Sequence, residues 1–258
     1  MPLADDPGRP AGRVLLDRAG EEIARFDEHE RDDRRVADLF ELADGVAPER
    51  AVRVALEELG GWRISAHERF GRLLVVAGAR PRRHGHVMSR DLVRDPAPPE
   101  WLEPPLPHRV RLTAVDRPAI DLAPACRAAY PPEHPDYHHI PAPDRPELEL
   151  DEMISGRLMG PLLDCSGLAV GDDGTVLGAV LVNRTQGVPP MGGPWIAQLF
   201  RRPDARGVGS ALLRRALALA TRDGLPAIGL AVTHGNPAAR LYAAHGFADV
   251  LESLTVEL

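Results

Sequence analysis

Apolar residues in the second half of the chain follow two periods. Short apolar runs bounded by Gly, Pro or Asp predict strands, and apolar residues three or four positions apart predict helices. The predicted strands are 109–115, 167–170, 175–182, 195–200, 227–232 and 250–258, and the predicted helices are 121–129, 148–163, 209–221 and 237–245. The runs on either side of Gly171–Gly174 predict a hairpin. This order predicts a mixed α/β layer.

The first hundred residues are less regular. They predict a hairpin of 13–17 with 22–26, a helix at 48–59, a strand at 62–65 and a helix at 67–77. The stretch 72–78 can be aligned with 240–246, since each is a short apolar helix that follows a strand and ends in Gly. Two readings stay open: a shortened, degenerate copy of the C-terminal part, or chance similarity between amphipathic helices.

Residues 96–107 separate these regions, because six of the twelve are proline. Proline cannot donate to a helix or sheet ladder, so the segment is expected to be a stiff, exposed linker. The expected organisation is a smaller N-terminal α/β domain at 1–95, the linker at 96–107 and a second domain at 108–258.

Composition narrows the functional class. The net charge of −7 argues against nucleic-acid binding, and all 31 basic residues are Arg, which points to the coding bias of a GC-rich genome. Two cysteines, Cys126 and Cys165, are too few for a disulfide framework or a zinc site and are expected to be reduced thiols. No signal peptide and no membrane helix are predicted, so the expected location is the cytoplasm of a bacterium.

The turn at 206–211 carries the first chemical signal. Gly207 and Gly209 allow close backbone approach, and the helix that follows offers unpaired N–H groups to a pyrophosphate. An ordinary strand-to-helix connector would look similar. A dinucleotide fingerprint is disfavoured, because Leu212 stands in place of the third Gly. A P-loop would need a Lys, and the chain has none.

Two motifs in order resemble the GCN5-related N-acetyltransferase (GNAT) family. The first matches at Arg206, Gly209 and Ala211, and the second, after the next strand, at six positions. Those six are Asn236, Ala239, Leu241, Tyr242, Gly246 and Phe247. The resemblance covers roughly residues 108–258. It implies a mixed, mostly antiparallel sheet flanked by helices, with the parallel strands 195–200 and 227–232 splayed apart.

The resemblance further implies that acetyl-CoA is the cosubstrate, with its pantetheine arm between the splayed strands. A bulge expected at Phe200 and Arg201 would aim a backbone N–H at the thioester carbonyl. Arg201 stands where the family often has an apolar residue, which leaves the direction of its side chain open. The implied cofactor-binding residues are Leu199, Phe200, Arg201, Arg206, Gly207, Val208, Gly209, Ser210, Ala211, Asn236 and Tyr242.

Tyr242 matches the general acid of the family, which protonates the leaving thiolate. Leu74 aligns with it in the N-terminal half, which is therefore expected to bind no acetyl-CoA. That half is expected to cover the catalytic domain and to help shape the acceptor site. No general base is identified. The acceptor-site candidates are Asp121, Glu133, His134, Tyr137, His138 and His139. The prolines around 133–139 argue against a metal cluster, and His84 and His86 are expected to face solvent, so no metal is expected.

The leading hypothesis is an acetyl-CoA-dependent N-acetyltransferase that acts by direct attack of a small-molecule or peptide amine. The alternative is a non-catalytic module that binds acetyl-CoA as a sensor or scaffold. A dinucleotide-dependent oxidoreductase ranks third. No nucleic-acid or membrane partner is expected, and a monomer or a homodimer would both fit.

Overall fold

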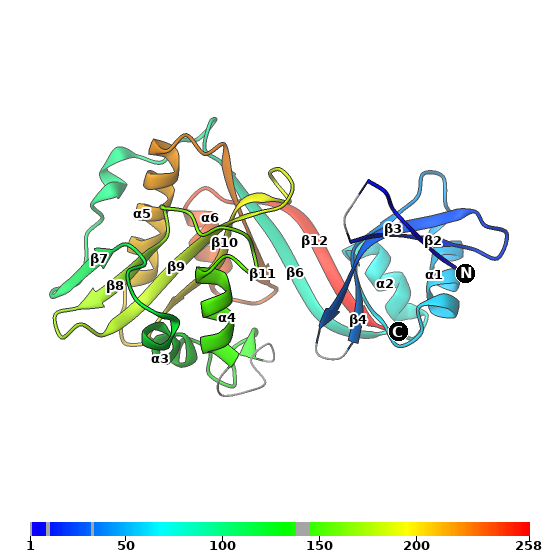
Figure 1. Cartoon of the computed structure of the whole chain (residues 1–258), viewed down its shortest axis with the longest axis horizontal. Helices are drawn as coiled ribbons and strands as arrows, with labels where there is room; N and C mark the ends of the chain where they lie inside the picture. The colour runs from blue at the N-terminus through cyan, green and yellow to red at the C-terminus, as the bar shows by residue number, and fades with distance from the viewer. Residues whose placement is uncertain (1, 9–10, 32–33, 138–144) are drawn as a thin grey trace. The chain divides into compact units, whose positions relative to one another are not determined.

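The computed structural model describes residues 2–8, 11–31, 34–137 and 145–258 (Figure 1). The chain divides into two compact units. The first consists of Met1–His86 and Leu251–Leu258, and the second of Val87–Val250. In the described part of the chain, no helix is long and apolar enough to span a bilayer.

The first unit is a mixed sheet with two helices. Its strands are β1 (Leu3–Asp5), β2 (Gly12–Leu16), β3 (Glu22–Arg31), β4 (Arg34–Leu42), β5 (Arg63–His67), the start of β6 (Arg80–Asp91) and the end of β12 (Ala248–Glu257). Its helices are α1 (Pro48–Glu58) and α2 (Glu68–Val76). Strands β1 to β4 are antiparallel neighbours, β4 and β5 are parallel, and β12 lies antiparallel beside β5.

Aromatic side chains fill the core of the first unit. Phe40 stacks on Phe26 and Phe70 at ring-centroid distances of 5.7 and 5.4 Å, and Trp62 meets Phe26 edge-on. In α2, a Cβ on Gly71 would lie 2.6 Å from Cβ of Leu254, so only glycine lets this helix approach β12 so closely.

The second unit holds the remaining elements. Its strands are the end of β6, β7 (Val110–Thr113), β8 (Gly167–Gly171), β9 (Val176–Thr185), β10 (Gly193–Arg201), β11 (Ala227–Thr233) and the start of β12. Its helices are η1 (Pro99–Leu102), α3 (Ala119–Ala129), α4 (Arg145–Ile154), α5 (Val208–Arg222) and α6 (Ala238–Ala244). The strand order is β6-β11-β10-β9-β8-β7. Strands β10 and β11 are parallel, and β7 to β10 are antiparallel neighbours.

Strands β8 and β9 are apolar on both faces because helices cover both faces of the sheet. Ala169 and Val180 belong to the core cluster that includes α5. Their sequence neighbours Leu168 and Leu181 belong to the opposite cluster, with α3 and α4. The alternation follows the two-residue period of a strand. The predicted mixed α/β fold with helices on a mixed sheet is confirmed.

The two units repeat one order of elements. The series β2-β3-β4-α1-β5-α2-β6 has the same order as β8-β9-β10-α5-β11-α6-β12. The last strand of each series does not stay with its own unit, because the end of β12 pairs with β5 and the end of β6 neighbours β11. Each unit therefore receives its closing strand from the other series of elements.

The proline-rich segment 96–107 is not the exposed linker that was expected. It lies wholly within the second unit, which begins at Val87. Ala97 is buried and its N–H donates to Oγ1 of Thr221 at 3.1 Å. Trp101 and Leu102, in η1, pack against the core that contains α5. Proline cannot donate the backbone hydrogen bonds of a strand, so the segment joins no sheet. Its apolar side chains nevertheless pack against the core of the second unit.

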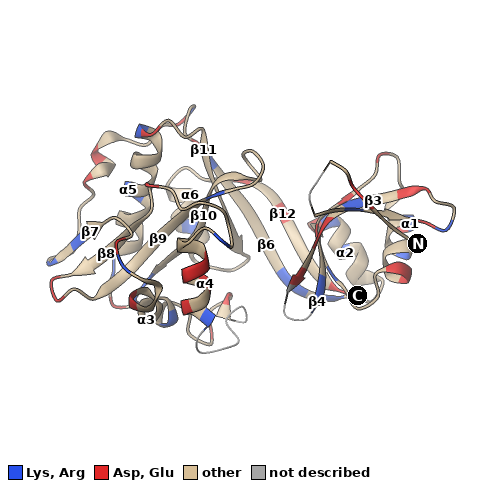
Figure 2. Cartoon of the chain, in the orientation of Figure 1, with Lys and Arg blue, Asp and Glu red and all other residues tan. Residues whose placement is uncertain are grey.

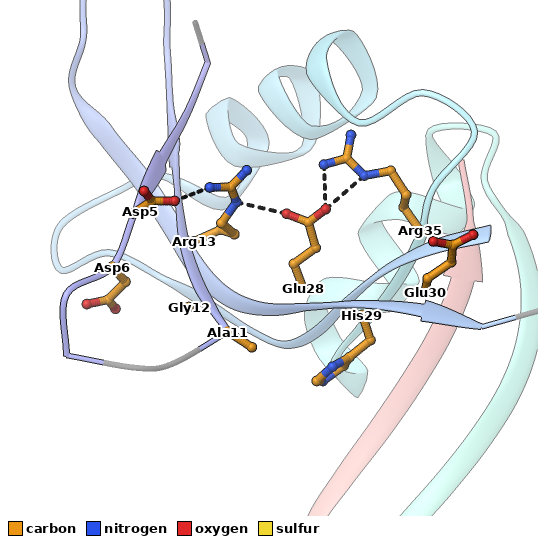
Figure 3. Close-up of a pocket in the computed structure, with 9 residues that line it drawn as sticks. All are labelled: Asp5, Asp6, Ala11, Gly12, Arg13, Glu28, His29, Glu30 and Arg35. Atoms are coloured by element: carbon orange, nitrogen blue, oxygen red, sulfur yellow. Dashed lines mark hydrogen bonds and ion pairs between the residues drawn. The ribbon is translucent and has the colours of Figure 1, made fainter. Parts of the chain in front are cut away.

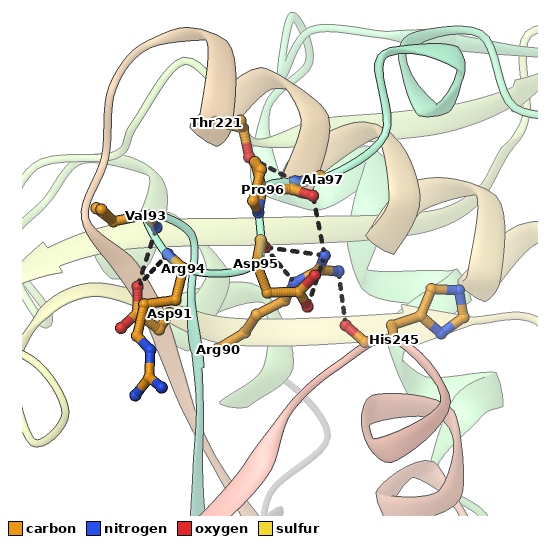
Figure 4. Close-up of polar contacts among 9 residues, drawn as sticks. All are labelled: Arg90, Asp91, Val93, Arg94, Asp95, Pro96, Ala97, Thr221 and His245. Atoms are coloured by element: carbon orange, nitrogen blue, oxygen red, sulfur yellow. Dashed lines mark hydrogen bonds and ion pairs between the residues drawn. The ribbon is translucent and has the colours of Figure 1, made fainter.

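Arg90, at the end of β6, anchors the start of this segment (Figure 4). Its side chain is only 3% exposed and donates to the carbonyl of Asp95 at 3.1 and 3.2 Å and to that of His245 at 2.8 Å. The guanidinium also lies 5.2 Å from the ring of Trp101. Burial lowers the pKa of Arg90, and the charge of Asp95 opposes the shift.

Helix α4 ends at Ile154, nine residues before the predicted end. Gly156 and Gly160 have φ values of +78° and +77°, which a continuing helix does not allow. A Cβ on Gly160 would come within 2.2 Å of the carbonyl oxygen of Arg184, so the chain turns back against β9 at this point.

Candidate active site

The N-terminus of α5 is uncapped and lies behind a left-handed glycine. Gly207 caps the helix in the left-handed conformation, with φ of 83°, and no side chain caps the first turn. The first turn also holds no acidic residue. The N–H groups at the start of a helix have no partner inside it and carry the positive end of the helix dipole. Arg206, which is exposed, adds a positive charge next to them.

Gly209 lies one residue inside α5, and its own packing does not explain why it is glycine. A Cβ built there would meet Cδ of Arg201 at 3.8 Å and Cδ2 of Leu241 at 4.0 Å, which are ordinary contacts. The residue needs no left-handed backbone either. A glycine in a helix costs about 0.5–1 kcal/mol relative to alanine. The missing side chain is therefore explained better by a ligand than by the fold.

Arg201 turns toward its own loop. Its Nη1 donates to the carbonyls of Arg202 and Pro203, each at 2.8 Å. The side chain thereby braces the turn that leads to α5. Among the predicted cofactor residues, the side chains of Phe200, Val208 and Ala211 are buried in the core, so only their backbone could contact a ligand.

Strands β10 and β11 separate soon after they pair. Trp195 aligns with Gly229 and Ile196 with Leu230, and the parallel register goes no further. The β-bulge of β10 lies between Ile196 and Gln198, where the register against β9 shifts. The predicted splayed pair is present, but the bulge is at Ala197 and not at Phe200–Arg201. A bulge leaves one residue out of the ladder, so a backbone group there faces away from β9.

Tyr242 lies on α6 and is 7% exposed. Its ring packs against Phe247, with centroids 5.7 Å apart. Among the described residues, its hydroxyl has no hydrogen-bond partner. Burial, followed by the charge of Asp136, raises the pKa of Tyr242 well above its usual range. The phenol therefore stays protonated at neutral pH.

Asp136 is a site residue that the sequence reasoning missed. Its carboxylate accepts hydrogen bonds from Nδ2 of Asn236 at 2.8 Å and from Oγ1 of Thr233. These partners stand at the end of β11 and before α6, so the carboxylate is tied to the elements that carry Tyr242. The acceptor-site candidates include its loop neighbours Glu133 and His134 but not Asp136. The signal in the sequence that could have identified it is an acidic residue in a proline-rich loop.

Asn236 uses both side-chain atoms within the protein. Besides holding Asp136, its Oδ1 accepts from the N–H of Ala238 at 2.8 Å and caps α6. The residue is 9% exposed. Its place in the motif is thus explained by the start of α6 and by Asp136, and contact with a cofactor remains a prediction.

Tyr130 bridges α3 to the bulged strand. Its hydroxyl donates to Oε1 of Gln198, the residue after the bulge, at 3.0 Å. The ring of His134 stands edge-on to Tyr130 at 4.8 Å. Burial is the main reason that the pKa of Tyr130 is raised well above its usual range. The described part of the loop is therefore attached both to β10 and, through Asp136, to β11.

The predicted acceptor residues divide into groups. His134 is half-buried and contacts Asp136, whose N–H donates to Nδ1 of His134 at 3.1 Å. Asp121 and Glu133 are exposed, and Tyr137 is 38% exposed. His138 and His139 lie outside the described residues.

His245 joins α6 to α5. Its Nε2 accepts from Nε of Arg214 at 3.2 Å and lies 3.1 Å from Oγ of Ser210, which leaves Nδ1 to donate to the carbonyl of Leu241 at 2.8 Å. Burial lowers the pKa of His245, Arg214 and Arg90 add to the shift, and the Leu241 carbonyl opposes it. The neutral imidazole therefore connects α5 and α6 through hydrogen bonds.

Gly246 follows as the predicted cap of α6, with φ of +80°. A Cβ there would lie 2.8 Å from Oδ2 of Asp95 and 3.1 Å from Nε of Arg90. This glycine is needed both for its backbone conformation and for the close approach of Arg90.

Other features do not compete as catalytic sites. Cys126 and Cys165 are free and buried, and burial raises the pKa of each thiol to about 12, so neither is a nucleophile at neutral pH. Figure 2 shows acidic and basic residues mixed along β3 and β4 of the first unit.

A pocket of about 620 Å³ in the first unit is lined by such charges (Figure 3). Glu28 accepts from Nε of Arg13 at 2.8 Å and from Nε of Arg35 at 2.9 Å, and Arg13 also pairs with Asp5. Both lining arginines are paired with carboxylates, and Asp6 and Glu30 leave the lining net acidic, so we assign no ligand to this pocket.

Comparison with known proteins agrees with the motifs. Residues 125–247 match the family described as the Acetyltransferase (GNAT) family. No curated protein matches the sequence significantly.

Three solved structures share the fold over 96% of this chain. A GCN5-related N-acetyltransferase from Sphaerobacter thermophilus is 19% identical, with a TM-score of 0.59 and 80% of its own chain covered. A tandem GNAT protein from the clavulanic acid biosynthesis pathway is 15% identical, with a TM-score of 0.58 and 83% covered. A GNAT-family acetyltransferase from Colwellia psychrerythraea is 10% identical, with a TM-score of 0.58 and 85% covered.

Proposed function

Because residues 125–247 match the GNAT acetyltransferase family, we propose that the second unit transfers an acetyl group from acetyl-CoA to an amine by direct attack. The observation that carries the proposal is the uncapped N-terminus of α5 behind Gly207. Its N–H groups and Arg206 suit the pyrophosphate of the cosubstrate. Gly209 leaves room for that pyrophosphate without serving the packing of the fold.

The rest of the cosubstrate would follow the strands. The pantetheine arm would lie where β10 and β11 separate, and the thioester carbonyl would accept a hydrogen bond from the backbone at the bulge near Ala197. A donor held there stabilises the charge that develops on this oxygen as the carbon becomes tetrahedral. Tyr130 supports the position by fixing Gln198.

Tyr242 would give its proton to the sulfur as the C–S bond breaks. Its hydroxyl has no hydrogen-bond partner among the described residues, and its raised pKa keeps the phenol protonated before the reaction. Asp136 would attract the ammonium group of the acceptor, which must release a proton to solvent before the neutral amine attacks the thioester carbon. Its carboxylate is held by Asn236 and Thr233, so it is positioned before the acceptor arrives.

We propose further that the first unit is a degenerate GNAT-like copy that binds no acetyl-CoA. Leu74, fully buried, takes the position aligned with Tyr242. The start of α1 has Pro48 in its first turn and an acidic residue, Glu49, where α5 has none. A carboxylate at a helix N-terminus would repel a phosphate.

The test is turnover of acetyl-CoA with a panel of amines, in which release of the CoA thiol is the measured signal. Binding of acetyl-CoA is measured separately by calorimetry. An enzyme releases thiol only when an accepted amine is present, and Tyr242→Phe should lower kcat by about 10²–10⁴-fold with little change in acetyl-CoA affinity. Binding without turnover for every amine would favour the sensor. No binding at all would refute both.

A further inference from the structure

Two histidines and a glutamate gather on one face of the first unit. His84 and His86 are two residues apart on β6, so the pleat of the strand directs both rings to the same side. Glu252 is on β12, the neighbouring strand. The expectation that the two histidines face solvent is wrong, since both are half-buried, as is Glu252.

The three side chains are close enough to share one ion. Nε2 of His84 lies 2.6 Å from Oε1 of Glu252, and the two imidazole rings are stacked with centroids 5.3 Å apart. One ligand atom from each residue lies within 4.8 Å of the others. Around a tetrahedral zinc ion with bonds of about 2.0–2.1 Å, ligand atoms are roughly 3.3 Å apart. Shifts of about 1 Å would therefore bring all three into bonding distance.

We propose that His84, His86 and Glu252 form a binding site for a divalent first-row transition metal, for which zinc is the probe. Two imidazoles and one carboxylate are a ligand set that suits Zn²⁺ and Fe²⁺ and is poor for Mg²⁺ or Ca²⁺, which prefer oxygen. This site is independent of the proposed acetyl transfer.

The ion would join two strands that are distant in the sequence. The part of β12 in the first unit reaches β6 through side chains such as Ser253, whose Oγ donates to the carbonyl of Gly85 at 3.4 Å, and Glu257, which pairs with Arg82. A metal bonded to both strands would fasten the C-terminal strand to β6. The expected effect is structural, so zinc should raise the melting temperature by mass action.

The experiment uses the full chain without a histidine tag, stripped with a chelator and then titrated with zinc chloride. One zinc per chain should bind, as measured by calorimetry and by elemental analysis after dialysis. His86→Ala and Glu252→Gln should each weaken binding by more than about tenfold, because loss of even a supporting partner of a metal ligand costs 10–100-fold. His108→Ala, at an exposed position in the second unit, should bind as the wild type does.

Circular dichroism would establish that the variants are folded. The wild-type titration decides the proposal even if a variant does not fold. If the wild-type chain binds no stoichiometric zinc, the three residues form only an ion pair with a stacked neighbour, and the proposal is overturned. Equal binding by the two folded ligand variants and the wild type would overturn it as well.

Discussion

Asn236 donates through Nδ2 to Oδ2 of Asp136 at 2.8 Å, so the residue that caps α6 also holds an acidic side chain of the preceding loop. One side chain thus determines both where the helix of Tyr242 begins and where the nearby negative charge stands. These two contacts explain why the motif has asparagine at position 236 without any direct contact with a cofactor.

Replacing that charge should affect the acceptor and spare acetyl-CoA. Asp136→Asn is expected to raise the KM for the amine by roughly 10- to 100-fold, since a hydrogen bond to a charged group contributes about 1.5–3 kcal/mol. The dissociation constant for acetyl-CoA should stay the same. Steady-state kinetics and calorimetry check both, with Glu103→Gln, at an exposed position away from this loop in the sequence, as the control. Unchanged amine kinetics would leave Asp136 a structural role only.

Gly209→Ala should separate stability from binding. The added methyl has room and removes a glycine from a helix, so the free energy of unfolding should rise by about 0.5–1 kcal/mol. Affinity for acetyl-CoA should fall, and Gly209→Glu should lower it further by adding negative charge beside the pyrophosphate. Urea denaturation and calorimetry measure the two effects. An alanine variant that binds acetyl-CoA unchanged would show that the ligand does not approach this residue.

His245 predicts a specific pH dependence of stability. Its folded pKa lies below the value of about 6.5 in the unfolded chain, so the unfolded state binds more protons near pH 6. The stabilisation is present above about pH 6.5 and is lost as the pH falls from there through the lowered pKa. His245→Gln should therefore flatten the loss of unfolding free energy between about pH 7 and pH 5.

The control for this measurement is His108→Asn, since that histidine is exposed and its loss should leave the pH profile unchanged. A wild-type profile as flat as that of His245→Gln would mean that the imidazole is not held neutral by the fold.

Arg90→Met should loosen the segment that begins at Asp95. The carbonyls of Asp95 and His245 would lose their buried donor, at about 1–3 kcal/mol for each unsatisfied group, so the free energy of unfolding should fall by roughly 2–5 kcal/mol. Limited proteolysis should then cut within 96–107, where the wild type resists. The exposed Arg94→Met is the control. If the wild type is already cut there as readily, the packing of this segment does not protect it.

The helices and strands around the two motifs could be predicted from the sequence because their apolar patterns are strong and their turns contain Gly or Pro. Strand β6 escaped prediction, since its first residues are polar and include Pro81 and Gly85. The bulge at Ala197 depends on how β10 pairs with β9, and no local pattern records that pairing. Asp136 belongs to the site only because the fold brings Thr233 and Asn236 to it.

The closing strands of the two units have a consequence for biosynthesis. Residues 251–258 emerge from the ribosome long after the rest of the first unit, yet they supply the strand that pairs with β5 and the buried side chain of Val256 in that unit. Until these residues are synthesised, the edge of β5 in the nascent N-terminal half has no partner strand. An unpaired strand edge can pair with other chains and promote aggregation. A late stop codon would damage the half of the protein that was made first.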